Sequence, residues 1–421
     1  MMDFKLKAPM KAFWSLAVPF VKVWMGVLMK PTVIDRLPDD LKPPYLIISN
    51  HVTVYDGLIV ALYSRHLPVV VFDDVQKLDF LKTLLFENSG VIFKPVGIPD
   101  PLVVRHMVKA RDAGRNILLY PEGEITWTGD SKPLEHNLAR LVKLLRMPVV
   151  LAKFKGGYAK QPNWANSTRN GRCQLEYDLL LTPEQLDAMD DAQVLQHLAS
   201  AHRHSEIDWL RSEQGETFQY SSSLPALGLQ LLLFCCPSCK GTNCMKSDAS
   251  GIRCSKCGYS ATLDANLRMT ADPGKKPAID DIREWYGWQL GYWKETIRRR
   301  SEQGGAILRA DSNDILSSPI GGHKLAKTGQ GPVVLDNGGL HFTDIEGKVR
   351  TIQIGEIKAV HSVKFSANRD YRLLIRTSAD FFMIPLIEPN LPVLSWELAI
   401  EEMISMAEER KVVDRADPIP R

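Results

Sequence analysis

A histidine and an aspartate stand five residues apart, where an apolar segment ends and a helical pattern begins. His51 and Asp56 belong to the sequence Ser-Asn-His-Val-Thr-Val-Tyr-Asp-Gly, residues 49–57. Since residues five apart on one helix point about 140° away from each other, a working pair needs His51 in the turn and Asp56 in the first helical turn. A carboxylate bound to one imidazole nitrogen fixes the tautomer, so the ring can take a proton from a hydroxyl. The alternative is a surface histidine beside a helix-capping aspartate.

Two Cys-x-x-Cys pairs, separated by fourteen residues, form the strongest single local signal: Cys236, Cys239, Cys254 and Cys257. Each pair can turn two thiolates toward one ion, and two pairs complete a tetrahedral zinc site. The pattern resembles a zinc ribbon. Four thiolates fill the coordination shell of zinc, so we expect a structural ion and not a catalytic one. Cys235 and Cys244 are expected to be spare thiols, although Cys235 offers an alternative register.

The length, composition and net charge favour a globular chain of two to four domains and give no support to nucleic-acid binding. Of the 421 residues, 45% are hydrophobic and 24% are charged, so a sizeable core can be buried. The formal net charge of +3 is too small to indicate a nucleic-acid partner. The stretch 240–253 between the cysteine pairs has few basic residues and no aromatic ones. Cysteines paired for a metal suit a reducing compartment better than a disulfide framework does.

Residues 31–215 alternate strand and helix patterns, which predicts an α/β layer fold with a mixed or largely parallel sheet. Strands are predicted at 45–48, 68–72, 90–93, 116–120, 148–154 and 174–181. Helices are predicted at 57–65, 76–88, 100–113, 133–146 and 191–212. His51 and Glu122 then follow the carboxyl ends of two strands, where sites in such sheets usually lie.

The segment around His51 resembles the first motif of the glycerolipid acyltransferases, the lysophosphatidic acid acyltransferase family. A second resemblance follows at the expected distance in Leu-Leu-Tyr-Pro-Glu-Gly, residues 118–123, which looks like the Pro-Glu-Gly motif of that family. Two motifs in the right order are much more specific than either alone. The resemblance covers roughly residues 30–215.

Two other motifs depart from the family pattern at the positions where it carries arginine. In residues 90–96 the family has Gly-x-x-Phe-x-x-Arg, and here Val96 replaces the arginine. Lys94 could supply a cation for a phosphate instead, or be an ordinary solvated lysine. After Gly123 the chain reads Glu-Ile-Thr where the family has Thr-Arg-Ser. Because an arginine fork is the natural partner of a phosphate monoester, an acceptor with a phosphodiester or a non-phosphate head is at least as plausible as lysophosphatidic acid.

The resemblance implies acyl transfer from acyl-coenzyme A or acyl-carrier protein to a hydroxyl of a lysophospholipid or related lysolipid. His51 would act as general base, and Asp56 would orient it. Glu122 would shape the acceptor site, and backbone N–H groups near Gly123 would bind the oxyanion. Two alternatives stay open. One is a thioesterase, in which the same pair directs water at the thioester, and the other is a non-catalytic, membrane-docked lipid-binding protein.

The first thirty residues combine lysines with an apolar helical stripe. The segment has five lysines and one acidic residue, and its apolar side chains recur at helical spacing: Phe13, Leu16, Phe20, Trp24, Val27 and Leu28. This predicts a helix lying in a membrane interface, with packing on the protein's own core as the alternative. The apolar run 13–29 is marginal for crossing a bilayer. We therefore expect a protein associated with the cytoplasmic face of a membrane.

The chain after the cysteine pairs predicts a linker with an aromatic helix at 280–300 and then a second domain. Seven or so short alternating segments and a closing helix at 393–410 resemble a pleckstrin-homology-like β-barrel. Its basic residues suggest lipid or partner binding, with a scaffold role as the alternative: Lys348, Arg350, Lys364, Arg369 and Arg372. The predicted organisation is 1–30 membrane-interface segment, 31–215 acyltransferase domain, 216–268 zinc ribbon with apolar lead-in, 269–302 linker and aromatic helix, and 303–421 pleckstrin-homology-like domain.

Overall fold

The computed structural model describes residues 8–74, 91–95, 97–98, 100–320, 322, 324–365, 370–386 and 392–416. The chain divides into two units by its internal contacts. The first contains the chain up to residue 225 together with residues 265–267, and the second contains residues 226–264 and the chain from residue 268 onward. The predicted helix 76–88 and Val96 lie outside the described residues.

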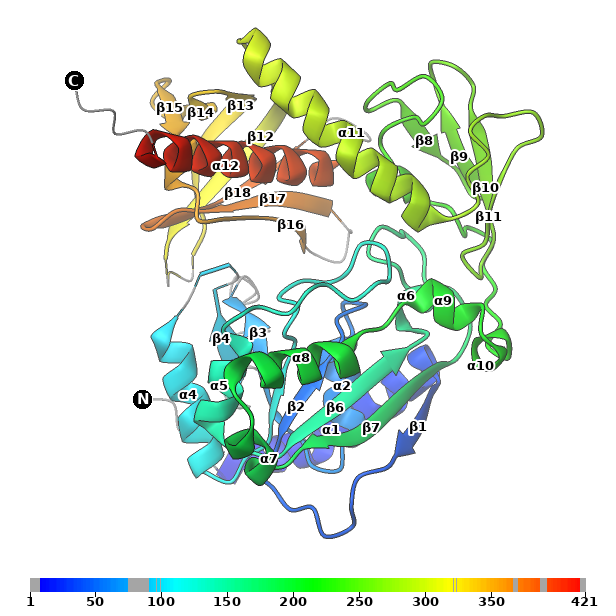
Figure 1. Ribbon diagram of the computed structural model, residues 1–421, viewed down its shortest axis with the longest axis vertical. Helices are drawn as coiled ribbons and strands as arrows, with labels where there is room; N and C mark the ends of the chain where they lie inside the picture. The colour runs from blue at the N-terminus through cyan, green and yellow to red at the C-terminus, as the bar shows by residue number, and fades with distance from the viewer. Residues whose placement is uncertain are drawn as a thin grey trace. The chain divides into compact units, whose positions relative to one another are not determined.

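A mixed seven-stranded sheet organises the first unit, in the order β1-β7-β6-β2-β5-β3-β4 (Figure 1). Its strands are β1 Pro31–Asp35, β2 Leu46–Ser49, β3 Val69–Asp73, β4 Ile92–Lys94, β5 Ile117–Leu119, β6 Val149–Lys155 and β7 Cys173–Leu181. Neighbouring strands are parallel except β6 and β7. The predicted mixed α/β sheet is therefore confirmed, and β1 is a strand that the sequence analysis did not predict.

The helices of the first unit begin at side chains that satisfy their free backbone N–H groups. Asp100 accepts a hydrogen bond from the N–H of Leu102 ahead of Pro101, and Asp190 and Gln193 form a capping box. The helices are α1 Ala8–Met29, α2 Asp56–Tyr63, α4 Pro101–Asp112, α5 Leu138–Leu145, α6 Gly157–Lys160, α7 Pro183–Ala188, α8 Asp191–His202, α9 Glu206–Leu210 and α10 Glu213–Glu216. The predicted single helix 191–212 is wrong, because the chain turns at Arg203 and Ser205 caps α9.

Alternate side chains of the central strands enter two different layers of the core. Helices α4, α5 and α8 cover one face of this sheet (Figure 1). Ile48 and Leu119 belong to one buried cluster with Val142 of α5 and Leu198 of α8. Helix α2 contacts β3 and β6, and α1 packs against α2. The central strands are thus buried on both faces, which explains their continuous apolar sequences.

Helix α1 is 22 residues long and contains Pro19. Among the described residues, the structure contains no helix that is long and apolar enough to cross a membrane.

A small antiparallel sheet begins the second unit, in the order β11-β10-β9-β8. Its strands are β8 Met245–Ser247, β9 Gly251–Cys254, β10 Ser260–Leu263 and β11 Met269–Ala271. The apolar lead-in forms a short 3₁₀-helix, Leu229–Leu231, and Leu232 and Leu233 are fully buried.

Helix α11, Ile282–Gln303, leads into a seven-stranded antiparallel sheet with the order β15-β14-β13-β12-β18-β17-β16. The strands are β12 Leu308–Pro319, β13 Ala326–Asp336, β14 Gly339–Asp344, β15 Val349–Ile352, β16 Ala359–Phe365, β17 Asp370–Arg376 and β18 Asp380–Pro385, followed by α12 Val393–Ala416. Seven strands and a closing helix agree with the prediction.

The predicted closure of this sheet into a barrel is wrong. Strands β15 and β16 are the two edges, and the described residues show no pairing between them. Instead α12 packs against β16 and β17, and the carboxylate of Glu397 accepts the N–H of Ser362 on β16 at 2.7 Å. The buried Trp396 adds apolar packing on this side. A helix therefore lies against the strand that closure would have paired.

Candidate functional site

His51 and Asp56 form the pair that their spacing predicts. His51 lies in the turn after β2, and Asp56 is the first residue of α2. The Nδ1 atom of His51 lies 2.9 Å from Oδ2 of Asp56. The imidazole packs on the Tyr120 ring with centroids 4.5 Å apart, and 22% of the His51 side chain is exposed. Because Nδ1 is held by the carboxylate, Nε2 is the nitrogen left to exchange a proton with a substrate.

Asp56 is fully buried and also holds the turn that carries His51. Its Oδ2 accepts the backbone N–H groups of Val52 at 2.6 Å and Thr53 at 3.0 Å. Burial raises the pKa of the Asp56 carboxyl, and the hydrogen bonds to His51 and to the turn oppose that rise. A carboxylate at the start of α2 is also favoured by the helix dipole. One carboxylate thus fixes both the tautomer and the position of His51.

Glu122 ties the loop after β5 to the loop after β2. Oε1 accepts the backbone N–H of His51 at 3.1 Å, and Oε2 accepts the backbone N–H of Lys132 at 2.8 Å. The Glu122 side chain has no exposed surface. These contacts give it a positioning role beneath the site, where the sequence analysis expected it to shape the acceptor pocket.

A buried histidine from α8 lies beside this carboxyl group. Nε2 of His202 is 3.4 Å from Oε1 of Glu122, and both side chains are buried. Burial raises the pKa of Glu122 to about 7 and lowers the pKa of His202 to about 4. The sequence analysis missed His202, because it lies eighty residues from Glu122 within an ordinary helical pattern.

The raised pKa of Glu122 predicts a pH dependence of stability. The folded chain holds a proton on Glu122 up to about pH 7, whereas the ordinary pKa is 4.5. Between about pH 4.5 and pH 7 the unfolded state binds fewer protons than the folded state. The contribution of Glu122 to the free energy of unfolding therefore falls as pH rises through this range, by at most about 3 kcal/mol. In Glu122→Gln this contribution is absent, while the opposing titration of His202 remains. Denaturant unfolding of both proteins across this range measures the difference, and parallel pH profiles would contradict the prediction.

Two further buried polar groups hold the backbone around the site. The Asn50 side chain donates to the carbonyl of Phe154 and accepts its N–H, both at 2.8 Å, which joins β2 to β6. Glu206 on α9 accepts the N–H groups of Gly156 at 3.1 Å and Ala159 at 3.0 Å. Sequence reasoning did not find Glu206, because a glutamate near a helix start is normally a solvated residue.

Gly57 allows α2 to approach the sheet closely. A Cβ atom at this position would lie 2.9 Å from the ring of Phe72 on β3. A larger residue would push the start of α2, and with it Asp56, away from the sheet. The glycine of the His-x-x-x-x-Asp-Gly sequence is thus explained by packing.

The remaining residues predicted for this site lie farther from the reacting pair. Strands β2, β5, β3 and β4 are parallel, so Lys94 at the end of β4 lies on the same sheet edge as His51, three strand spacings or about 14 Å along it. Gly123 has a φ of +76°, and its N–H donates to the carbonyl of Tyr120 at 3.2 Å. The N–H of Gly123 could bind an oxyanion only if its hydrogen bond to the carbonyl of Tyr120 were broken.

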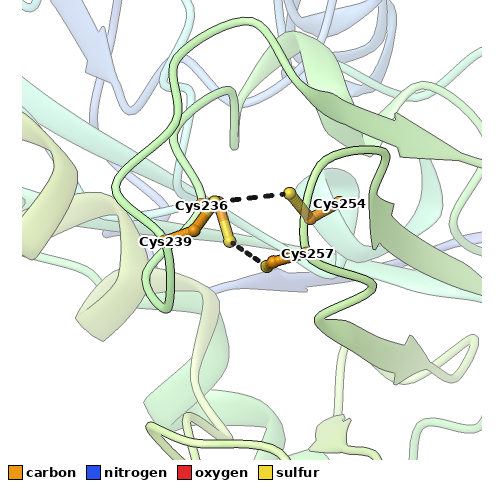
Figure 2. A group of neighbouring side chains, drawn as sticks. All are labelled: Cys236, Cys239, Cys254 and Cys257. Atoms are coloured by element: carbon orange, nitrogen blue, oxygen red, sulfur yellow. Dashed lines mark hydrogen bonds between the residues drawn. The ribbon is translucent and has the colours of Figure 1, made fainter.

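The four predicted zinc ligands lie together in the second unit (Figure 2). The Sγ atoms of Cys236 and Cys257 are 3.6 Å apart, and those of Cys239 and Cys254 are 3.7 Å apart. All four Sγ atoms lie within 4.8 Å of one another. Cys235 is not part of this group, so the alternative register is not the one that the structure brings together.

The basic side chains predicted on the C-terminal domain make contacts within that domain. Nζ of Lys348 lies 2.9 Å from a carboxylate oxygen of Glu346, and Lys364 lies over the ring of Tyr371. Arg350 lies over the ring of Phe382, and Arg372 donates to Sδ of Met383 at 3.6 Å. Arg369 lies outside the described residues. These contacts fit the scaffold alternative at least as well as a lipid-binding surface.

Comparison with known proteins agrees with the motifs around His51 and Glu122. Residues 30–152 match the acyltransferase family model. Among solved structures, the chain is similar to the 1-acyl-sn-glycerophosphate (LPA) acyltransferase PlsC from Thermotoga maritima. The identity is 14%, the match covers 48% of this chain and 82% of that one, and the TM-score is 0.37. Likeness at this TM-score carries no argument about substrate. The family match supports an acyltransferase domain in the first unit of this protein.

Proposed function

We propose that the protein transfers a fatty acyl group from an acyl thioester to the hydroxyl of a lysophospholipid or related lysolipid. The observation that carries the proposal is the His51–Asp56 pair, with Nδ1 and Oδ2 2.9 Å apart, inside the segment that matches the acyltransferase family. The donor is acyl-coenzyme A or acyl-carrier protein. Both are thioesters, which are activated enough to react without a covalent enzyme intermediate.

The pair has the arrangement that general-base catalysis needs. Nε2 of His51 takes the proton of the acceptor hydroxyl as its oxygen attacks the thioester carbonyl. The carbon–sulfur bond then breaks, and the leaving thiolate takes the proton from the imidazolium. Asp56 stabilises that imidazolium and remains ionised, held by the N–H groups of Val52 and Thr53.

The polar groups near the site suit an acceptor without a phosphate monoester. Ile125 stands where the resemblance predicts arginine, and beside it Glu124 forms an ion pair with Lys132 at 2.5 Å. Lys94 is too far along the sheet edge to contact the reacting hydroxyl, so we assign it to a distal part of the acceptor. A lysolipid with a phosphodiester or a non-phosphate head fits these positions better than lysophosphatidic acid does.

Acyl transfer can be tested with labelled acyl-coenzyme A and labelled acyl-carrier protein on a panel of lysolipids with different head groups. We expect a diacyl product with one class of head group and one donor. Release of free fatty acid without transfer would identify a thioesterase instead. Lysolipid binding without any turnover would leave a non-catalytic lipid-binding protein.

We further propose that α1 attaches the protein to the cytoplasmic face of a membrane. One side of α1 is packed, since Met25 and Met29 are fully buried. The other side presents apolar residues that are each more than half exposed: Leu16, Phe20, Val23, Trp24 and Val27. A helix with one buried and one exposed apolar side fits the headgroup boundary of a bilayer, and the exposed Lys22 and Lys30 favour anionic lipid.

Replacing Phe20 and Val27 together by glutamate should weaken binding to anionic liposomes by at least about tenfold, because two apolar side chains can no longer enter the lipid. Liposome sedimentation measures the change. The matched control is Leu102→Glu with Leu144→Glu, which adds the same charge at exposed leucines of α4 and α5. Equal binding by the two double variants would contradict the proposal.

A further inference from the structure

We propose that Cys236, Cys239, Cys254 and Cys257 hold one zinc ion, and that this ion fixes the first half of helix α11. A tetrahedral site with zinc–sulfur bonds of about 2.3 Å places its sulfur atoms about 3.8 Å apart. The observed Sγ separations of 3.6 and 3.7 Å fit that geometry. Four thiolates leave no open position, so the ion is structural.

The two cysteine pairs lie on turns of the same construction, which points to one shared ligand. In the first turn the N–H of Lys240 donates to the carbonyl of Cys236 at 2.9 Å, and in the second the N–H of Gly258 donates to that of Cys254 at 3.0 Å. Each donor residue has a left-handed φ, +58° for Lys240 and +72° for Gly258. A lysine adopts this conformation at a cost in free energy, so the turn is held by its surroundings.

The segment that leads into the first cysteine turn is hydrogen-bonded to two side chains of α11. Oε1 of Gln289 accepts the N–H groups of Phe234 at 2.7 Å and Cys235 at 2.8 Å. Nε1 of Trp285 donates to the carbonyl of Cys235 at 2.9 Å. Gln289 and Trp285 are fully buried, so these bonds are shielded from water. The backbone just before Cys236 is therefore joined to α11.

Both turns reach α11 by other contacts as well. The hydroxyl of Tyr292 donates to the carbonyl of Lys240 at 2.8 Å. The carbonyl of Tyr259 accepts the N–H of Cys254 at 2.7 Å, and its ring packs edge-on against Trp285 with centroids 5.4 Å apart. An ion that joins the two turns thus closes a ring of contacts around residues 285–292.

Helix α11 carries this constraint to helix α12 of the C-terminal domain. Nε1 of Trp293 donates to the carbonyl of Ser395 on α12 at 2.9 Å, and Arg298 pairs with Glu409 at 2.8 Å. Hydrogen exchange of α11 amides should therefore depend on the metal, since the helix loses its support on one side when the turns separate.

The experiment measures metal content and hydrogen exchange of residues 282–303 in the full chain. Wild type should contain one zinc per chain. Cys239→Ser with Cys257→Ser, a change at two exposed positions, should lose the ion and exchange α11 amides at least about tenfold faster. The matched control is Cys244→Ala, because its Sγ lies 3.5 Å from that of Cys254 but outside the four-sulfur group. It should keep the ion and the slow exchange.

A second variant separates metal binding from its effect on the helix. Gln289→Ala should keep one zinc and yet exchange the amides of residues 285–292 faster. If the double cysteine variant does not fold, chelated wild type serves instead, and added Co²⁺ should give thiolate-to-cobalt absorption. Iron in place of zinc, loss of the ion in Cys244→Ala, or equal exchange with and without metal would each overturn the proposal.

Discussion

Replacing His51 by alanine should lower the rate of acyl transfer by about 10³-fold, within the range that general acid–base catalysis contributes. His51 supplies the only nitrogen that we assign to remove the acceptor proton, and Asp56 cannot replace it because that carboxyl is fully buried. The rate is measured with the donor and acceptor that the lysolipid panel identifies. Binding of the lysolipid should change little, since the imidazole acts on the reacting hydroxyl.

The matched control is His66→Ala, because His66 is an exposed histidine in the same unit. Its variant should retain the wild-type rate. Thermal unfolding of His51→Ala should stay close to wild type, because Asp56 keeps its bonds to Val52 and Thr53. A His51→Ala protein that keeps more than about a tenth of the rate would exclude the general-base role.

Replacing Asp56 by asparagine should lower the rate by about 10² to 10⁴-fold, because the negative charge that stabilises the His51 imidazolium is lost. In wild type the same oxygen, Oδ2, accepts the N–H groups of Val52 and Thr53 and lies 2.9 Å from Nδ1 of His51. An asparagine oxygen in that place keeps all three contacts, and its amide nitrogen takes the place of Oδ1. The tautomer of His51 is then retained, so the expected loss of rate comes from the missing charge.

The tautomer can be observed by ¹⁵N NMR of the His51 ring. We expect the signal of an Nδ1-protonated ring in Asp56→Asn, as in wild type, with a lower kcat and an unchanged KM for the acceptor. Glu122→Gln is the matched control, since it changes a buried carboxyl that contacts only the backbone of His51. The prediction fails if Asp56→Asn keeps the wild-type rate, or if its His51 ring carries the proton on Nε2.

The sequence by itself determined the features that depend on short spacings. The turn between β2 and α2 brings His51 to Asp56 because five residues, a strand end and a helix start leave little freedom. The two cysteine pairs likewise predict their cluster from spacing alone. Most strands of the two seven-stranded sheets were predicted, because apolar alternation is a local property of the chain.

Only the tertiary structure decided which distant polar groups are buried together. Glu122 was expected to shape the acceptor site. In the structure both of its carboxylate oxygens accept backbone N–H groups, and His202 of α8 lies beside it. The hydrogen bonds of Gln289 and Trp285 to the backbone before Cys236 were also not predicted, although the aromatic helix was. The open C-terminal sheet was missed for the same reason. The alternation of apolar and polar residues in a strand indicates which of its faces is buried. The pairing of edge strands and the contacts of buried polar groups depend instead on the positions of segments far apart in the chain.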